Sequence, residues 1–358
     1  MSTETRSFAD NNPAESAADS RETVAAAEAT LDASPRRAEI TLFFENDSTP
    51  LKLIDRTDRQ YTSGLGLLVA HQPAWAESFS KTLPSFDGLD SPAATAAGYM
   101  LQQQIYTPDD LRLPTAANGD RRYAGYVAAS VFVQRADVRT LDHLQIDLGV
   151  IGEASGAEIT QQNWHDAVGI QEPQAWDTQL DDEPTFQMMA RKKWRWALYE
   201  RGDALRHELI PRVELVLGTV RRHVAADVLW RASFMALPND FGPSQLNDPA
   251  APLTGLPSLV EVSPLDLEKS WWAYGYVRAG GMLVEHDTFI EGSDFQTSTG
   301  LDVMPVVGRV EIGLEAVKRL GSGKLRFGFY QRFLTDEFEG QTRPHSYGGL
   351  VLSWSWAL

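Results

Sequence analysis

The residues best suited to chemistry stand in four short clusters in the first half of the chain. The first cluster, residues 45–48, contains Asn46 and Asp47 at the end of an alternating segment. Their amide and carboxylate oxygens suit a hard cation such as calcium. The same pair is also typical of a turn, because Asn and Asp side chains bond to their own backbone there.

Residues 57–67 (TDRQYTSGLGL) form the second cluster, in which Thr62 opens an alternating segment. Its hydroxyl or carbonyl oxygen could bind a metal, although an ordinary strand start explains it equally well. The third cluster, residues 102–126, includes QQQIYTPDD and GDRRYAGY. This pattern indicates a strand, an acidic loop and a second strand, with little functional signal of its own.

The fourth cluster lies in residues 157–168 (AEITQQNWHDAV), which predict a helix of about three turns. Gln161 and His165 are four residues apart and therefore share one face of that helix. A histidine with an amide partner can serve as a general base, although a lone histidine is more often structural. Neither GxSxG nor HExxH is present, so serine hydrolases and zinc proteases lack their usual signals.

The elements that must position these clusters are predominantly strands, because apolar residues recur at every second position from Ala38 onward. Near the C-terminus Leu352, Trp354 and Trp356 share one face, which we expect to contact lipid. Twelve such segments are predicted, near residues 39–46, 62–70, 98–106, 122–134, 143–151, 185–196, 205–220, 222–236, 270–288, 304–318, 324–336 and 346–358. An even number of alternating strands favours an all-β fold, a closed transmembrane antiparallel β-barrel. A β-sandwich with inward apolar faces is the alternative.

Three stretches depart from this pattern. Residues 1–37 hold one aromatic residue and many small polar ones, so we expect a disordered tail before a barrel domain of residues 38–358. Residues 24–31 could form a short helix within this tail, which lacks the apolar region of a secretory signal peptide. Residues 72–97 and 237–265 are rich in Pro, Ser, Gly and Asp and predict long loops.

Composition narrows the class of protein. The chain has 358 residues, with 49 acidic against 32 basic residues and a net charge of -17. No basic stripe is present to neutralise phosphates, which argues against nucleic acid as a partner. The absence of cysteine excludes disulfides and thiolate chemistry. No run of 18 apolar residues exists, so helical membrane spans are excluded, while alternating strands are not.

Taken together and in order, the clusters resemble the outer-membrane lipid A 3′-O-deacylase family. The matching segments are Asn46-Asp47, DRQYTSGL at 58–65, QQIYTPDD at 103–110, GDRRYAGY at 119–126, LGVIG at 148–152, QQNWH at 161–165 and AWDTQLDDEP at 175–184. The resemblance is strong over about residues 39–200 and follows the strand pattern beyond. It implies a twelve-stranded barrel in the cell outer membrane, with a short helix near the rim, over the barrel mouth, that carries the catalytic histidine.

The resemblance also implies calcium-dependent hydrolysis of an ester-linked acyl chain of lipid A, with lipopolysaccharide and outer-membrane lipids as partners of a monomer. His165 matches the family's base, and Asp47 and Thr62 match its metal positions. Asn46 and Gln161 match further active-site positions that would bond to the carbonyl or the attacking water. Arg112 is the cation nearest to a family lysine and could bind a substrate phosphate. Gln171, with Glu172 beside it, stands where the family can show an acid.

Two alternatives to the deacylase remain. One is a non-catalytic barrel that keeps the scaffold as a pore or structural protein. The other is a soluble β-sandwich or lipid-binding barrel, motivated by the tail without a signal peptide.

Overall fold

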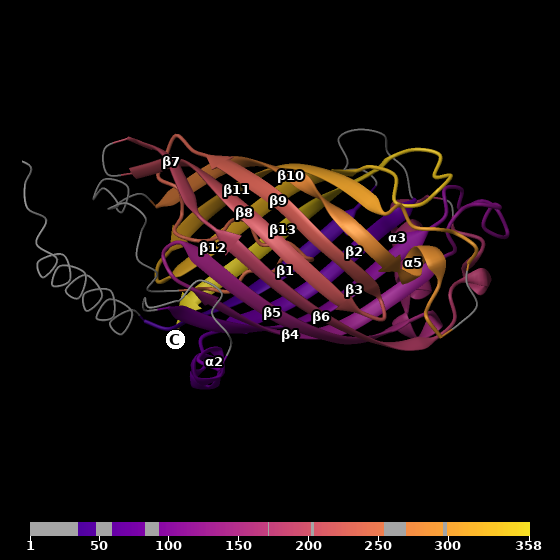
Figure 1. Cartoon of the computed structure of the whole chain (residues 1–358), viewed down its shortest axis with the longest axis horizontal. Coiled ribbons are helices and arrows are strands. Elements are labelled where there is room, and N and C mark those ends of the chain that lie inside the picture. The colour runs from indigo at the N-terminus through magenta and orange to yellow at the C-terminus, as the bar shows by residue number, and fades with distance from the viewer. Residues whose placement is uncertain are drawn as a thin grey trace, which may run out of the picture.

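The computed structural model describes residues 35–47, 59–82, 93–170, 172–201, 204–253, 270–295 and 299–358. Twelve antiparallel strands form a closed ring, in which each strand pairs with its neighbour along the chain. The ring closes where β1 pairs with β13 and where residues 187–193 of β6 pair with residues 212–218 of β8. Figure 1 shows the strands tilted around an elongated barrel, with the C-terminus at one end and α3 near the other.

The strands of the ring are β1 (Arg37–Asn46), β2 (Gln60–His71), β3 (Ala94–Thr107), β4 (Ala124–Ala136), β5 (Thr140–Ile151), β6 (Glu183–Trp194), β8 (Ala204–Gly218), β9 (Arg221–Ala232), β10 (Trp271–Asp287), β11 (Val306–Leu320), β12 (Gly323–Leu334) and β13 (His345–Ala357). The elements that are not part of the ring are β7 (Trp196–Arg201), the helices α2 (Ala74–Ser80), α3 (Ala157–Val168) and α5 (Thr288–Glu291), and the 3-10 turns η1 (Glu153–Ser155) and η2 (Trp176–Thr178).

Each of the twelve predicted strands corresponds to one strand of the ring, and the predicted helix at 157–168 has the same bounds in the structure. Two predictions need correction. The segment 185–196 was expected as one strand, but it ends at Trp194, and β7 then pairs only with the start of β8. The expected loop at 72–97 contains helix α2, and its last residues already belong to β3. The tail of residues 1–34 and the helix expected at 24–31 lie outside the described residues.

Alternation along each strand separates an apolar outer wall from a polar lumen. On β1, for example, Ile40 and Leu42 are exposed on the wall, whereas Glu39 and Thr41 are buried inside. Leu352, Trp354 and Trp356 lie on the outward face of β13, as the sequence predicts. A β-sandwich is therefore wrong: the sheet closes on itself, and its apolar face points outward rather than into a core. Among the described residues, no helix has the length and apolar character to cross a bilayer.

Part of the connection between β9 and β10 occupies the lumen; its described residues, 233–253, we call the lumen segment. It enters from the end of the barrel that carries the C-terminus, because β9 ends and β10 begins there. Leu246 is fully buried, and it packs where a Cβ on Gly64 or Gly66 would overlap it. The prediction of a loop at 237–265 is confirmed for residues 237–253, where one isolated bridge joins Gln245 and Asp248.

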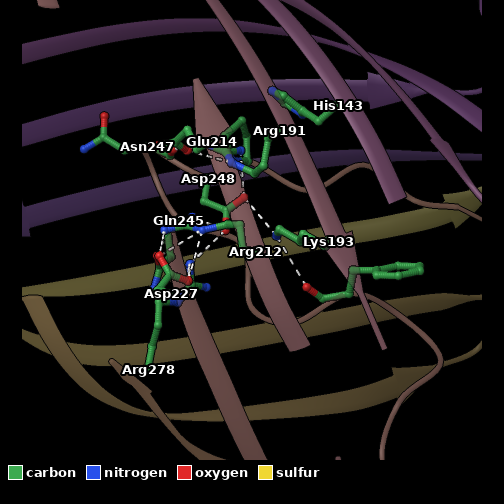
Figure 2. A network of polar contacts seen from close by, with 12 residues as sticks. His143, Arg191, Lys193, Arg212, Glu214, Asp227, Gln245, Asn247, Asp248 and Arg278 are labelled. Carbon is green, nitrogen blue, oxygen red and sulfur yellow. Dashed lines mark hydrogen bonds and ion pairs between the residues drawn. The ribbon is translucent and has the colours of Figure 1, made fainter. Parts of the chain in front are cut away.

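Asp248 anchors the lumen segment to the strands (Figure 2). Its carboxylate meets four cations, at 2.8 Å from Arg191, 2.9 Å from Lys193 and Arg212 and 3.1 Å from Arg278. These cations come from strands β6, β8 and β10, so one buried acid ties the segment to both strands of the β6–β8 closure and to β10 nearby.

Candidate active site

Four of the six predicted site residues line a cavity of about 480 Å³ between α3 and the outer wall, which we call the outer-wall cavity. Its lining includes Asn46 of β1, Thr62 of β2, and Gln161 and His165 of α3. The structure therefore brings together four residues that are spread over about 120 positions of sequence. Asp47 follows Asn46 directly and is fully buried beside the cavity.

The end of β1 is held in place by bonds to β2. The backbone N–H of Asp47 donates to the carbonyl of Thr62 at 3.1 Å. The Asp47 carboxylate accepts the backbone N–H of Arg59 at 2.7 Å. Arg59 in turn pairs with Asp109 of the β3–β4 loop at 2.9 Å. This chain of contacts ties both ends of the β1–β2 connection to the β3–β4 loop and holds the carboxylate in place.

A β-bulge turns Thr62 toward the cavity. The pairing of β2 with β3 shifts register between Tyr61 and Ser63, so both Thr62 and Ser63 line the cavity although they are adjacent in sequence. Tyr61 points into the lumen, where its hydroxyl bonds to Glu45. The Thr62 hydroxyl lies 2.6 Å from that of Thr107. Counted from the outward Ser63, strict alternation would send Thr62 to the lumen, and the bulge lets both side chains face the cavity.

Helix α3 lies against the outer wall near the rim, not across the barrel mouth as expected. It is seated through Gly125 of β4, where a Cβ would overlap both Ser155 and Ala157. Gln103, on the outward face of β3, donates to the carbonyl of Ser155 at 2.8 Å. Close approach of the helix to the wall therefore depends on a glycine at position 125.

Gln161 and His165 project from α3 toward the wall and are 3% and 1% exposed. The indole N–H of Trp176 donates to Gln161 Oε1 at 2.9 Å. An indole can only donate, so this bond directs the Gln161 amide nitrogen away from Trp176. Among the described residues, that buried Nε2 has no hydrogen-bond partner. Because Gln161 lines the outer-wall cavity, its amide can donate to a ligand there.

The rest of the lining is largely apolar. Phe44, Leu65 and Ile105 contribute from the wall, and Trp164 and Ala167 from the helix. Leu65 is 37% and Trp164 38% exposed, so the cavity opens onto the apolar outer face of the barrel. The rings of Phe44 and Trp164 approach within 5.7 Å. The cavity thus joins a polar end to an apolar groove, which suits an amphiphile that approaches from the membrane.

The polar end fits a hard cation. Asn46 lines it with an amide oxygen and Thr62 with a carbonyl and a hydroxyl oxygen, while the carboxylate of the next residue, Asp47, is buried outside the lining. These are the donor types that calcium prefers. Within the part of the chain that the structure describes, no three His, Cys, Asp or Glu side chains cluster as for a metal site. A cation here would therefore depend on Asp47 together with neutral oxygens.

Arg112 and the segment after the helix lie outside the lining of the cavity. Arg112 is in the β3–β4 loop, exposed, and bonds to Asp110 at 2.8 Å. These hydrogen bonds lower the pKa of Asp110 to about 2. Its substrate-binding role stays a prediction. Gln171 lies outside the described residues, and Glu172 is exposed.

Sequence reasoning missed two residues that shape the site. Trp176 appeared only within the motif AWDTQLDDEP, and its contact to Gln161 links segments 15 residues apart. Thr107 ends β3 and became relevant only through its contact with Thr62. Alternation along β3 places Thr107 on the outward face, but no local sequence signal indicated the bulge of β2 that brings Thr62 next to it.

Comparisons with known proteins identify the family and agree with the fold. The profile of the family described as Outer membrane protein LpxR matches residues 14–356. The structure of LpxR from Salmonella typhimurium superposes with a TM-score of 0.65 at 16% identity, covering 89% of this chain and all of that one. The β domain of the Bordetella autotransporter BrkA aligns over 91% of this chain and 100% of its own, at 10% identity and a TM-score of 0.40. No curated protein sequence matches the chain.

Proposed function

The chain belongs to the Outer membrane protein LpxR family of the cell outer membrane, and from this premise we propose that it removes an ester-linked acyl chain from lipid A. The supporting observation is the outer-wall cavity, where Asn46, Thr62, Gln161 and His165 meet beside an apolar groove that opens toward the membrane. A glycolipid could place its acyl chain in this groove while it remains in the bilayer.

In the proposed reaction, the acyl chain lies along Phe44, Leu65 and Trp164, with its ester at the polar end of the cavity. An imidazole nitrogen of His165 takes a proton from water, whose oxygen adds to the ester carbonyl carbon. The bond between that carbon and the sugar oxygen then breaks, and the sugar oxygen takes up a proton. The products are a free fatty acid and a free sugar hydroxyl.

Two side chains of the cavity would assist this step, one by stabilising the developing negative charge and one by orienting the reactants. The Gln161 side chain, whose Oε1 accepts the Trp176 indole N–H, offers its Nε2 as a preoriented donor to the carbonyl oxygen. Asn46 lies at the same polar end and can orient the water or the ester. Preoriented donors are effective because they need no reorganisation when charge develops.

Calcium is the metal that we propose for the site, held by Asp47 and Thr62 with Asn46 beside them. When bound, it would act as a Lewis acid toward the ester carbonyl.

The test is mass spectrometry of purified lipid A incubated with the protein, with and without a calcium chelator. We expect loss of one ester-linked acyl group in calcium and intact lipid A after chelation. His165→Asn and Asp47→Asn should each reduce the rate by about a hundredfold or more. His207→Asn and Asp302→Asn serve as matched controls, because both residues lie away from the cavity.

Unchanged lipid A in the presence of folded wild-type protein would refute the deacylase. Full activity in both site variants would refute the assignment of base and metal ligand, even if the chain cleaves lipid A.

A further inference from the structure

Helix α2 is attached to the outside of the barrel at the end that carries the C-terminus (Figure 1). Ala76 packs in a buried cluster with Ala97 of β3 and Val133 of β4, both on the outward faces of their strands. Arg135 Nη1 donates to the carbonyl of Ser80 at the end of the helix, at 2.8 Å. The helix therefore lies flat on the wall, in a position that lipid would otherwise occupy.

The remaining faces of α2 differ sharply in chemistry. Trp75 and Phe79 are four residues apart on one face, and they are 44% and 41% exposed. Glu77 and Lys81 form an exposed ion pair at 2.9 Å. At about 100° per residue, this pair lies on the side of the helix opposite to Trp75 and Phe79, with the wall-facing residues between. One side thus suits an apolar medium and the other suits water.

The level of α2 on the wall coincides with the edge of the apolar band. The outward residues of β3 run from Leu101 and Tyr99, which are exposed, to Ala97 beneath the helix and then to Thr95. On β4 the outward series likewise changes from apolar Val131 and Val133 to Arg135. A change from apolar to polar outward residues marks the membrane boundary of a β-barrel.

We propose that α2 is a membrane-interface helix, whose partner is the phospholipid leaflet at this end of the barrel. Trp75 and Phe79 insert into the leaflet, and Glu77 and Lys81 face the aqueous side. We infer lipid as the partner because the two aromatic side chains continue the lipid-facing surface of the wall on which the helix lies. Aromatic residues are favoured at this depth because they combine apolar surface with tolerance of the polar headgroup region.

Helix α2 and the outer-wall cavity lie near opposite ends of strand β2. On β2, Ser63 lines the cavity and His71 ends the strand just before α2. The eight intervening steps span about 26 Å along the strand, or about 20 Å across a bilayer at the usual tilt. This approaches the apolar height of about 25 Å for such barrels. Anchoring α2 in one leaflet therefore sets the level of the cavity in the opposite leaflet.

Site-directed spin labelling tests this proposal, and the absence of cysteine from the chain makes single labels straightforward. Trp75→Cys, Phe79→Cys, Glu77→Cys and Lys81→Cys are labelled in the full-length protein and reconstituted in phosphatidylethanolamine and phosphatidylglycerol vesicles. We expect labels at 75 and 79 to be several-fold more accessible to oxygen, relative to a water-soluble nickel chelate, than labels at 77 and 81. Leu101→Cys and Glu153→Cys provide the lipid and water references.

Equal accessibility to the nickel chelate at all four positions would overturn the proposal. Spin–spin broadening at 75 and 79 would overturn it too, because it would show a second copy of the chain on this face instead of lipid. Resistance of each unheated variant to SDS-induced unfolding confirms that the barrel is intact, so neither result can come from misfolding.

Discussion

In the lumen, the buried carboxylate of Asp248 meets four cations, whereas in the outer-wall cavity the buried amide of Gln161 keeps a donor without a partner among the described residues. A buried charge must be paired because desolvation is costly. An orphaned buried donor also costs free energy, so its retention at a cavity indicates a ligand. The ion pairs of the lumen thus stabilise the barrel, whereas the outer wall carries the cavity in which we propose the chemistry.

Asp248→Ala should produce the largest effect on stability. It leaves Arg191, Lys193, Arg212 and Arg278 without their shared acid, and breaking such buried pairs costs about 3–5 kcal/mol. Denaturant unfolding in detergent micelles measures the change, with Asp302→Ala as a surface control. Activity per folded molecule should be retained, and a specific loss of activity at full stability would contradict the division between lumen and wall.

Gly125→Ala should reverse that pattern, with a large effect on activity and a small one on the barrel. The added Cβ overlaps Ser155 and Ala157 and so displaces the start of α3 from the wall. Misplacing catalytic groups by about 1 Å can reduce a rate by about a hundredfold. Gly328→Ala is the matched control, because its Cβ would meet Val351 at an ordinary 3.4 Å. Wild-type kcat in Gly125→Ala would show that the seat of α3 is not needed.

Trp176→Phe should cause a smaller loss, which depends on Gln161. The ring still packs near Tyr123, but the bond that orients the amide is gone. Loss of one such hydrogen bond, about 1 kcal/mol, predicts a decrease in kcat of about five- to tenfold with little change in KM. In a Gln161→Ala background the same substitution should have no further effect. An equal loss in both backgrounds would indicate that Trp176 only supports packing.

Arg112→Ala should have the smallest effect, because the side chain is exposed and already bonded to Asp110. If Arg112 binds a substrate phosphate, KM should rise a few-fold with kcat unchanged, and Arg112→Lys should restore part of the affinity. Steady-state kinetics on lipid A in mixed micelles distinguishes the two parameters. A KM equal to that of the wild type in Arg112→Ala would remove Arg112 from the site.

The sequence predicted the regular elements well because their signals are local. Leu352, Trp354 and Trp356 alternate with small residues, and such alternation marks a strand wherever it occurs. The helix at 157–168 was predicted with its observed bounds. Helix α2 was missed because seven residues carry little periodicity beside Pro73. The end of β6 at Trp194 was missed because β7 continues the same strand-forming composition.

The site itself was predicted only as a set of residues. Asn46, Thr62, Gln161 and His165 were chosen by type and resemblance, and the structure gathers them in one cavity. Which way each side chain points was decided by contacts distant in sequence. The bulge at Tyr61–Ser63 depends on β3, and the orientation of Gln161 depends on Trp176.

By itself, then, the sequence determined a twelve-stranded barrel with an apolar outer face. The reason is that alternation within each strand fixes which side chains share a face. It also supplied the oxygen donors and the histidine. Only the tertiary structure decided that part of residues 233–253 occupies the lumen and that the candidate site lies on the outer wall. Both outcomes depend on where long connections pack, and such packing is selected by complementary shape and charge across the whole ring rather than by local pattern.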